Sequence, residues 1–136
     1  MAALALAGDA ARDFLAELES SAEVAALNAS HSVTISGPGA EIERLESEAK
    51  RRGLWFRALD LDFAFHSREM DPIRDDLLAS LIGLSSRYPN ARLVSTVTGE
   101  GVEGEPLDAE YWWRNIRSPV RFAEAIGRLI GEGYRI

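Results

Sequence analysis

The spacing of apolar residues changes several times within residues 1–61, and these changes restrict the possible folds more than any other feature of the chain. Short apolar runs predict strands, whereas apolar residues that recur every three or four positions predict amphipathic helices. The expected strands are Met1–Ala7, Ala22–Leu27, Ser32–Ser36 and a stretch that begins at Leu54; the expected helices carry Phe14, Leu15 and Leu18, and then Ile42, Leu45 and Ala49. The order strand, helix, strand, strand, helix, strand is typical of the ferredoxin-like βαββαβ arrangement.

Local signals indicate where these elements begin and end. Asn28 to His31 separates two expected strands at the spacing of a β-hairpin. Asp9 is placed to cap the first helix, and Gly53 ends the second as a glycine at position C′ would. After Leu54 the apolar residues fall on odd positions, at Trp55, Leu59, Leu61, Phe63 and Phe65. The polar residues Asp60 and Asp62 lie between them. This alternation predicts a strand with one buried face.

Residues 62–136 follow a different pattern, in which helices outnumber strands. The expected elements are a helix from Asp71-Pro72 with Leu77, Leu78, Leu81 and Ile82 buried, a strand at Arg92–Val97, a helix capped by Asp108, a helix from Ser118-Pro119 with Phe122, Ile126, Leu129 and Ile130 buried, and a strand that starts at Tyr134. These assignments rest on N-cap side chains, on proline at the first helical position and on helical spacing. Because the strand that starts at Tyr134 is cut off at its beginning, the Arg92–Val97 strand has no partner within this half, and we expect an incomplete part of a larger α/β structure.

The composition excludes several classes of protein. Lys and Arg total 15 against 22 Asp and Glu, which gives a net charge of −7 and argues against sequence-independent binding of nucleic acid. No apolar run approaches the roughly 20 residues that cross a bilayer. The apolar N-terminal stretch lacks the preceding positive charge of a signal peptide. The chain contains no Cys, which excludes disulfides and thiolate chemistry, and we expect a cytoplasmic location.

Two histidines are the candidates for general-base chemistry near neutral pH. His31 falls in the expected hairpin turn, where exposure to solvent is the simpler interpretation. His66 follows the expected aromatic strand, at the kind of strand end where α/β proteins place their sites, although a structural role is also open. Ser67 is its neighbour, but neighbours in an extended chain point in opposite directions. One face of the expected strand carries Asp60, Asp62 and His66, which could be metal ligands. Polar residues on a solvated strand face explain this pattern as well, and we expect no metal site.

Four segments together resemble the malonyl-type acyltransferase domains of type I polyketide and fatty-acid synthases. DFAFHS at residues 62–67 resembles the histidine motif of that family, and MAALAL resembles the strand that opens its small subdomain. VAALNASHSVTISG is similar to the family's hairpin, and EYWWRNIRSPVRFAEAI to its Y-W-x-x-N-x-R-x-P-V-x-F motif. The segments occur in the family's order and cover almost the whole chain, so their combination is specific.

This resemblance implies an architecture and a reaction. Residues 1–61 would be a ferredoxin-like small subdomain, and residues 62–136 would return to an incomplete α/β hydrolase-like core. An acyl group would move from a coenzyme A thioester to a serine, and then to the phosphopantetheine thiol of an acyl carrier protein, in a ping-pong reaction without a bound cofactor. The implied partners are the carrier protein, an adjacent ketosynthase and an upstream acyltransferase segment of the same synthase.

The resemblance also implies roles for individual residues. His66 matches the family's catalytic histidine, and Ser118 matches the position whose backbone carbonyl orients the imidazole. Asn28 matches an asparagine that borders the acyl pocket. Phe63 stands where malonyl-selective members usually carry histidine. Phe65 matches the malonyl form, because the methylmalonyl form has a smaller serine there, so we expect a malonyl group.

Three functional groups of the family have no counterpart within residues 1–136. They are the serine of a G-H-S-x-G turn, the glutamine of the oxyanion hole and the arginine that binds the acyl carboxylate, all of which precede the residue that matches Met1. Loss of the nucleophile in a serine–histidine enzyme lowers kcat by about a millionfold. We therefore expect the chain to be inactive alone.

Two functions of other classes stay open. Lys50, Arg51, Arg52 and Arg57 form a basic cluster in residues 1–61, which favours a non-catalytic docking module for an acidic carrier protein or another domain. A solvated basic end that complements the helix dipole is the simpler explanation of the cluster. A stand-alone small-molecule sensor of ferredoxin-like form would leave residues 62–136 unexplained.

Overall fold

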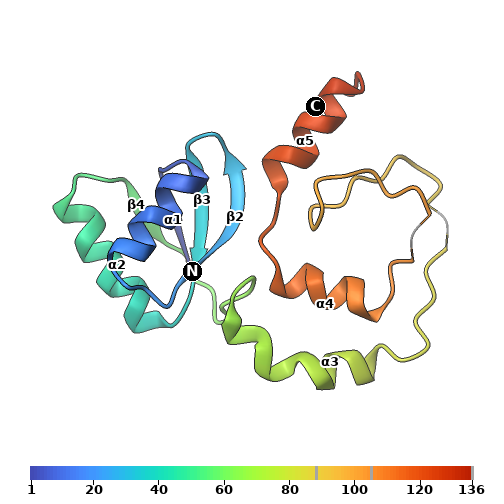
Figure 1. The fold of residues 1–136 in the computed structure, drawn as a ribbon, viewed down its shortest axis with the longest axis horizontal. Helices are drawn as coiled ribbons and strands as arrows, with labels where there is room; N and C mark the ends of the chain where they lie inside the picture. The colour runs from blue at the N-terminus through green and yellow to red at the C-terminus, as the bar shows by residue number, and fades with distance from the viewer. Residues whose placement is uncertain (88, 105, 136) are drawn as a thin grey trace.

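The structure, a computed structural model, describes residues 1–87, 89–104 and 106–135. Its first part holds a four-stranded antiparallel sheet in the order β2-β3-β1-β4 (Figure 1). The strands are β1 (Ala2–Leu4), β2 (Glu23–Ala29), β3 (Ser32–Ser36) and β4 (Phe56–Ala58), and the helices are α1 (Gly8–Glu17) and α2 (Gly39–Arg51). The chain passes through them as β1, α1, β2, β3, α2, β4, which is the order predicted from the spacing of apolar residues.

The core of this part lies between one face of the sheet and its two helices. Leu4 and Ile35, on neighbouring strands β1 and β3, are completely buried. The helices contribute the faces expected from the sequence: Phe14 and Leu15 of α1, and Ile42, Leu45 and Ala49 of α2. Burial of these side chains removes apolar surface from water, which is the main force that holds helices on a sheet.

The end of α2 joins the two helices. Gly53 adopts a left-handed φ of +68°, as expected for a glycine that follows a helix, and its N–H donates to the carbonyl of Lys50 at 3.1 Å. The guanidinium of Arg52 hydrogen-bonds Glu48 on its own helix and Glu17 of α1, the latter at 2.8 Å through both of its terminal nitrogens. The helices therefore meet through ion pairs at this end as well as through the core.

The second part of the chain follows an open, curved path beside β2 (Figure 1). Its helices are the 3-10 helix η1 (Arg68–Ile73), α3 (Arg74–Ser80), α4 (Ala109–Arg117) and α5 (Phe122–Gly131). It is attached to the sheet at Val120, which forms a parallel bridge to β2. There the N–H of Leu27 donates to the carbonyl of Val120, and the N–H of Val120 donates to the carbonyl of Ala25, both at 2.8 Å.

The long strand predicted from Leu54 is wrong in its extent, because β4 contains three residues. Its only partner among the described strands is β1, which also has three residues and pairs Leu4 with Phe56 and Ala2 with Ala58. Beyond that point the chain has no neighbouring strand to pair with, and turns replace the ladder. The odd-numbered apolar residues consequently do not form a buried face: Trp55, Leu61 and Phe63 are more than half exposed.

The helix predicted to start at Asp71-Pro72 starts earlier and in a different form. Ser67 caps η1, since its Oγ accepts a hydrogen bond from the N–H of Glu69 at 3.3 Å. The carboxylate of Asp71 instead accepts from Nε of Arg117 at 2.7 Å. The predicted apolar stripe is not buried: no residue of α3 is buried, and Ile82 is largely exposed.

Three other expectations differ from the structure, and one is confirmed. The Arg92–Val97 strand is reduced to a single bridge between Val94 and Gly101, and residues 134–135 form no strand, while Ile136 lies outside the described residues. Helix α1 begins at Gly8, so Asp9 lies inside its first turn, where it pairs with Arg12. The cap of α4 is as expected, because Asp108 accepts from the N–H of Tyr111 at 2.9 Å.

Removal of the Leu45 side chain should test the core. Leu45→Ala leaves a cavity beneath α2, because the side chain is completely buried, and we expect a loss of about 2–5 kcal/mol in the free energy of unfolding. Glu46→Ala, on the exposed face of the same helix, should change it by about 0.5 kcal/mol or less. Urea denaturation followed by circular dichroism measures both, and equal midpoints for the two variants would contradict this core.

Candidate active site

The segment between β4 and η1 presents His66 in an unusual backbone conformation. His66 has a φ of +59°, in the left-handed region that residues with a Cβ seldom adopt. Its N–H donates to the carbonyl of Ile116, in the last turn of α4, at 2.8 Å. The strained residue is therefore held by a backbone contact from a helix 50 positions away in the sequence, and the imidazole faces the segment that follows α4.

The imidazole makes a second contact with the same segment. Its Nδ1 lies 2.9 Å from the backbone carbonyl oxygen of Ser118. A carbonyl oxygen can only accept, so Nδ1 carries the proton and Nε2 of the neutral ring keeps its lone pair. Partial burial lowers the pKa of His66 below its ordinary value, while the bond to the Ser118 carbonyl opposes this shift. A neutral ring with a free Nε2 is the form that can accept a proton.

Ser118 does not begin a helix, contrary to the prediction from the Ser-Pro pair. Ser118 precedes proline and is extended, with φ −83° and ψ 155°, as an N-cap residue would also be, so the difference lies in the residues that follow it. Helix α5 begins at Phe122, three residues after Pro119. The extended segment instead reaches β2 through Val120, which places the Ser118 carbonyl relative to the sheet.

Ser67 plays a local structural part. It is completely buried, and its Oγ donates to the carbonyl of Ala64 at 2.7 Å while accepting from the N–H of Glu69. These bonds close the turn around His66. Both partners of this hydroxyl are backbone atoms and neither belongs to the imidazole, as expected for neighbouring residues that do not form a nucleophile and base pair.

Two aromatic side chains accompany the imidazole. The rings of Phe63 and Phe65 are tilted with their centroids 5.7 Å apart, and the ring of Phe65 lies 6.4 Å from that of His66. Phe63 is 61% exposed and Phe65 is 39% exposed. The segment thus brings partly exposed apolar rings close to the imidazole.

The described contacts do not join the other candidate residues to this group. Asn28, near the end of β2, donates from Nδ2 to Oγ1 of Thr34 at 3.0 Å across the hairpin, and the described contacts do not connect it with His66. His31 is exposed in the hairpin turn. Across residues 1–87, 89–104 and 106–135, no group of three His, Asp or Glu side chains could hold a metal ion. None of the helices in those ranges has both the length and the apolar character to cross a membrane.

Sequence analysis missed the residues that surround this contact. Arg117 lies between Ile116 and Ser118, the two residues whose carbonyls bind His66, and its side chain reaches Asp71 and Glu23. Its place within the quoted Y-W-x-x-N-x-R motif was the one available signal. Glu23 had none, because its partners lie 45 and 94 positions away in the sequence.

An NMR titration of the imidazole should show the effect of burial. We expect His66 to titrate below the ordinary value of 6.5. At pH values between the lowered pKa of folded His66 and the ordinary value of 6.5, the unfolded chain therefore binds more protons than the folded chain. The contribution of this group to stability is therefore complete above pH 6.5 and is lost as the pH falls through that window. His31→Gln assigns the signal, and a midpoint at or above 6.5 would contradict the buried, neutral ring.

Comparisons with known proteins agree with these features. The family model described as "Acyl transferase domain" matches residues 1–136. The chain is 36% identical to "Erythronolide synthase EryA2" of Saccharopolyspora erythraea over 134 residues, which is 98% of this chain and 4% of that protein. It is 35% identical to "Mycoketide-CoA synthase" of Mycobacterium tuberculosis over 135 residues, 99% of this chain and 3% of that protein.

Solved structures extend the likeness to the fold. The acyltransferase domain from module 8 of the salinomycin polyketide synthase superposes with a TM-score of 0.91 at 34% identity, and the match covers 96% of this chain and 31% of that one. A malonyl CoA-acyl carrier protein transacylase from Burkholderia pseudomallei gives 0.84 at 27% identity, over 97% of this chain and 46% of that one.

The chain therefore spans about a third of a solved acyltransferase domain and a few per cent of the synthases it matches. The family model covers all of its residues, and its identity to the two synthases is 36% and 35% over nearly its full length. This chain belongs to the acyltransferase domain family of the type I polyketide synthases.

Proposed function

We propose that this chain supplies the general base of a polyketide synthase acyltransferase that loads a carrier protein by a ping-pong serine–histidine mechanism. The observation that carries the proposal is the contact between Nδ1 of His66 and the carbonyl of Ser118, which leaves Nε2 as the basic atom. The ring of Phe65 lies 6.4 Å from the imidazole, and the ring of Phe63 lies 5.7 Å from that of Phe65. Membership of the acyltransferase family supports the same reaction class.

The proposed reaction has two halves. In the first, Nε2 of His66 takes the proton of a serine hydroxyl, the serine oxygen attacks the thioester carbonyl, and the C–S bond breaks as Nε2 gives that proton to the departing coenzyme A sulfur. In the second, Nε2 takes the proton of a phosphopantetheine thiol, the sulfur attacks the acyl-serine carbonyl, and the C–O bond breaks as the serine regains its proton. A pKa lowered by burial keeps His66 neutral and ready to accept at pH 7.

The serine in this scheme comes from another segment. The sequence contains no G-H-S-x-G turn, so residues 1–136 hold the base without the nucleophile. The oxyanion glutamine and the carboxylate-binding arginine of the family belong to that same segment. We therefore propose that the chain is inactive until it is combined with the remainder of an acyltransferase domain, of which it matches about a third of the length.

The two parts of the chain have different roles in this proposal. Residues 1–61 form a ferredoxin-like small subdomain, an assignment supported by the order β1, α1, β2, β3, α2, β4 and by the strand order β2-β3-β1-β4. Residues 62–136 form part of the large α/β subdomain. The exposed apolar side chains of α5 and its flanks, Phe122, Ile130 and Tyr134, support packing against a missing portion of that core.

The acyl group is proposed to be malonyl. Phe63 and Phe65 would line the acyl pocket, and Phe65 fills the space that a methyl branch would need. Asn28 would border the same pocket from the hairpin. The likeness to a malonyl CoA-acyl carrier protein transacylase supports a coenzyme A thioester and a carrier protein as substrates, without a bound cofactor.

The surrounding protein is proposed to be a multidomain synthase. The relatives are synthases of which this chain matches 4% and 3%, which supports further domains beside this one. The partners in this proposal are an adjacent ketosynthase and a carrier protein, in the cytoplasm. The docking-module alternative rests on the basic cluster, and the contacts of that cluster weaken it. Arg51 and Arg52 are bound by Glu48, and Arg52 also by Glu17, so acidic side chains of the chain already compensate much of the charge.

Replacement of the base should abolish transfer. The chain is inserted in place of the matching segment of the salinomycin module 8 acyltransferase domain, and acyl transfer from malonyl-CoA to a carrier protein is followed. His66→Ala should lower kcat by about 10³-fold or more, because the serine then lacks its proton acceptor. His31→Ala removes the exposed histidine and should leave kcat unchanged. Full activity of His66→Ala in an otherwise active hybrid would overturn the assignment.

A smaller side chain at position 65 should change the preferred substrate. Phe65→Ser makes room for one methyl branch, and we expect the ratio of kcat/KM for methylmalonyl-CoA over malonyl-CoA to rise by about 10- to 200-fold. Competition between the two thioesters measures this ratio. The matched control is Trp55→Ser, which removes an exposed aromatic side chain just before β4. An unchanged ratio in Phe65→Ser would place the pocket elsewhere.

A further inference from the structure

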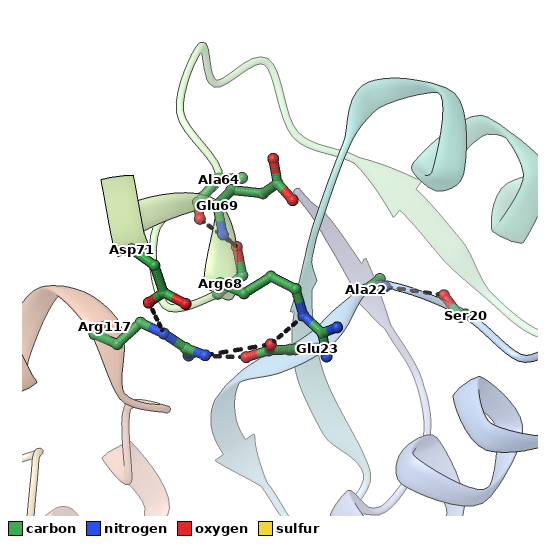
Figure 2. Close-up of polar contacts among 9 residues, drawn as sticks. Ser20, Ala22, Glu23, Ala64, Arg68, Glu69, Asp71 and Arg117 are labelled. Atoms are coloured by element: carbon green, nitrogen blue, oxygen red, sulfur yellow. Dashed lines mark hydrogen bonds and ion pairs between the residues drawn. The ribbon is translucent and has the colours of Figure 1, made fainter. Parts of the chain in front are cut away.

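One carboxylate of β2 binds two guanidinium groups from the segments on either side of the imidazole contact. Figure 2 shows Glu23 between Arg68 and Arg117, with Asp71 on the far side of Arg117. Oε1 of Glu23 accepts from Nε of Arg68 at 2.8 Å, and Oε2 accepts from Nη1 of Arg117 at 2.8 Å. Nε of Arg117 donates to Asp71 at 2.7 Å. The four side chains form one continuous ionic network.

The places of these residues in the sequence connect the network with the site. Arg68 is two residues after His66, at the start of η1. Arg117 lies between Ile116 and Ser118, whose carbonyls bind the N–H and the ring of His66. Glu23 therefore joins the segment that carries the imidazole to the segment that orients it. Because Glu23 is the first residue of β2, it also attaches both segments to the sheet.

The setting of the network makes it stronger than a typical surface ion pair. The side chains of Glu23 and Arg117 are only 22% and 27% exposed. Burial raises the pKa of Glu23, but the hydrogen bonds from Arg68 and Arg117 outweigh it and hold the pKa below its ordinary value. By contrast, the Arg74–Glu110 pair between α3 and α4 lies at 3.0 Å with 44% and 58% of its side chains exposed, where ion pairs contribute little.

The backbone of His66 needs the support that this network provides. A left-handed φ at a residue with a Cβ is unfavourable unless surrounding contacts enforce it. The bond to Ile116 and the bond to Ser118 enforce it only if the two segments keep their spacing. Resting on the proposed role of His66 as the base, we propose that Glu23 is a positioning residue, which holds Arg68 and Arg117 so that Nδ1 of His66 stays on the Ser118 carbonyl and Nε2 stays free.

The first test observes the ring directly and needs no enzymatic activity. In the ¹⁵N-labelled chain at pH 8, long-range ¹H–¹⁵N correlation spectra should show His66 as the Nδ1–H tautomer. Glu23→Gln keeps the shape of the side chain and removes its charge, and it should give a mixture in which the Nε2–H tautomer is populated. Arg68→Gln, a change at a largely exposed side chain, should act in the same direction.

Two controls separate positioning from general loss of stability. Glu110→Gln removes the carboxylate of the Arg74–Glu110 pair between α3 and α4 and should leave the His66 signals unchanged. Leu45→Ala destabilises the core at a distance from the site and, while the chain is folded, should also leave them unchanged. If Leu45→Ala disturbs the tautomer as Glu23→Gln does, the effect is one of stability, and the positioning role is overturned.

The second test uses the acyltransferase hybrid. Glu23→Gln should lower kcat by about 10-fold or more with KM for malonyl-CoA unchanged, because a displaced base affects the transfer step and leaves substrate binding intact. Glu110→Gln should retain the full kcat. A spectrum of Glu23→Gln that still shows a single Nδ1–H tautomer overturns the positioning role, whatever His66→Ala does. An active His66→Ala hybrid overturns the proposed function, while the tautomer result stands by itself.

Discussion

The hydrogen bond between Nδ1 of His66 and the carbonyl oxygen of Ser118 is the contact on which the candidate site depends. It is 2.9 Å long and joins residues 52 positions apart. Because a carbonyl cannot donate, this one bond selects the tautomer, directs the ring and leaves Nε2 basic. His66 and Ser118 both make this hydrogen bond in backbone conformations that their local sequence allows but does not by itself fix. His66 is left-handed, and Ser118 is extended because Pro119 follows it.

Strand β2 holds the two sides of this contact in place. Val120 extends the edge of the sheet by two hydrogen bonds to β2, which positions the Ser118 carbonyl two residues earlier. At the first residue of the same strand, Glu23 binds guanidinium groups from both segments that meet at His66. The core beneath the sheet keeps β2 in position, since Leu4 and Ile35 are completely buried in it. A strand of the first part of the chain thereby supports the site proposed for the second part.

Predictions from the sequence succeeded where the deciding interactions are local. The buried face of α2 and the glycine at its end follow from contacts within one or two helical turns, and the β2–β3 hairpin follows from strands joined by a short turn. They were wrong where a distant partner decides. The alternation after Leu54 suits a strand, but β4 ends where β1 ceases to pair with it. Asp71 is a good cap by type, yet Arg117 binds its carboxylate.

The sequence by itself determined the order of elements in residues 1–61, the faces that they bury and the motifs that identify the acyltransferase family, because these depend on residue types at fixed spacing. It also indicated His66 and Ser118 as a pair, through that resemblance alone. Only the tertiary structure decided that Ser118-Pro119 presents a carbonyl instead of starting a helix, and that Glu23 binds Arg68 and Arg117. Such contacts require segments up to 94 positions apart to meet at hydrogen-bond distance, and hydrophobic spacing along the chain carries no information about that meeting.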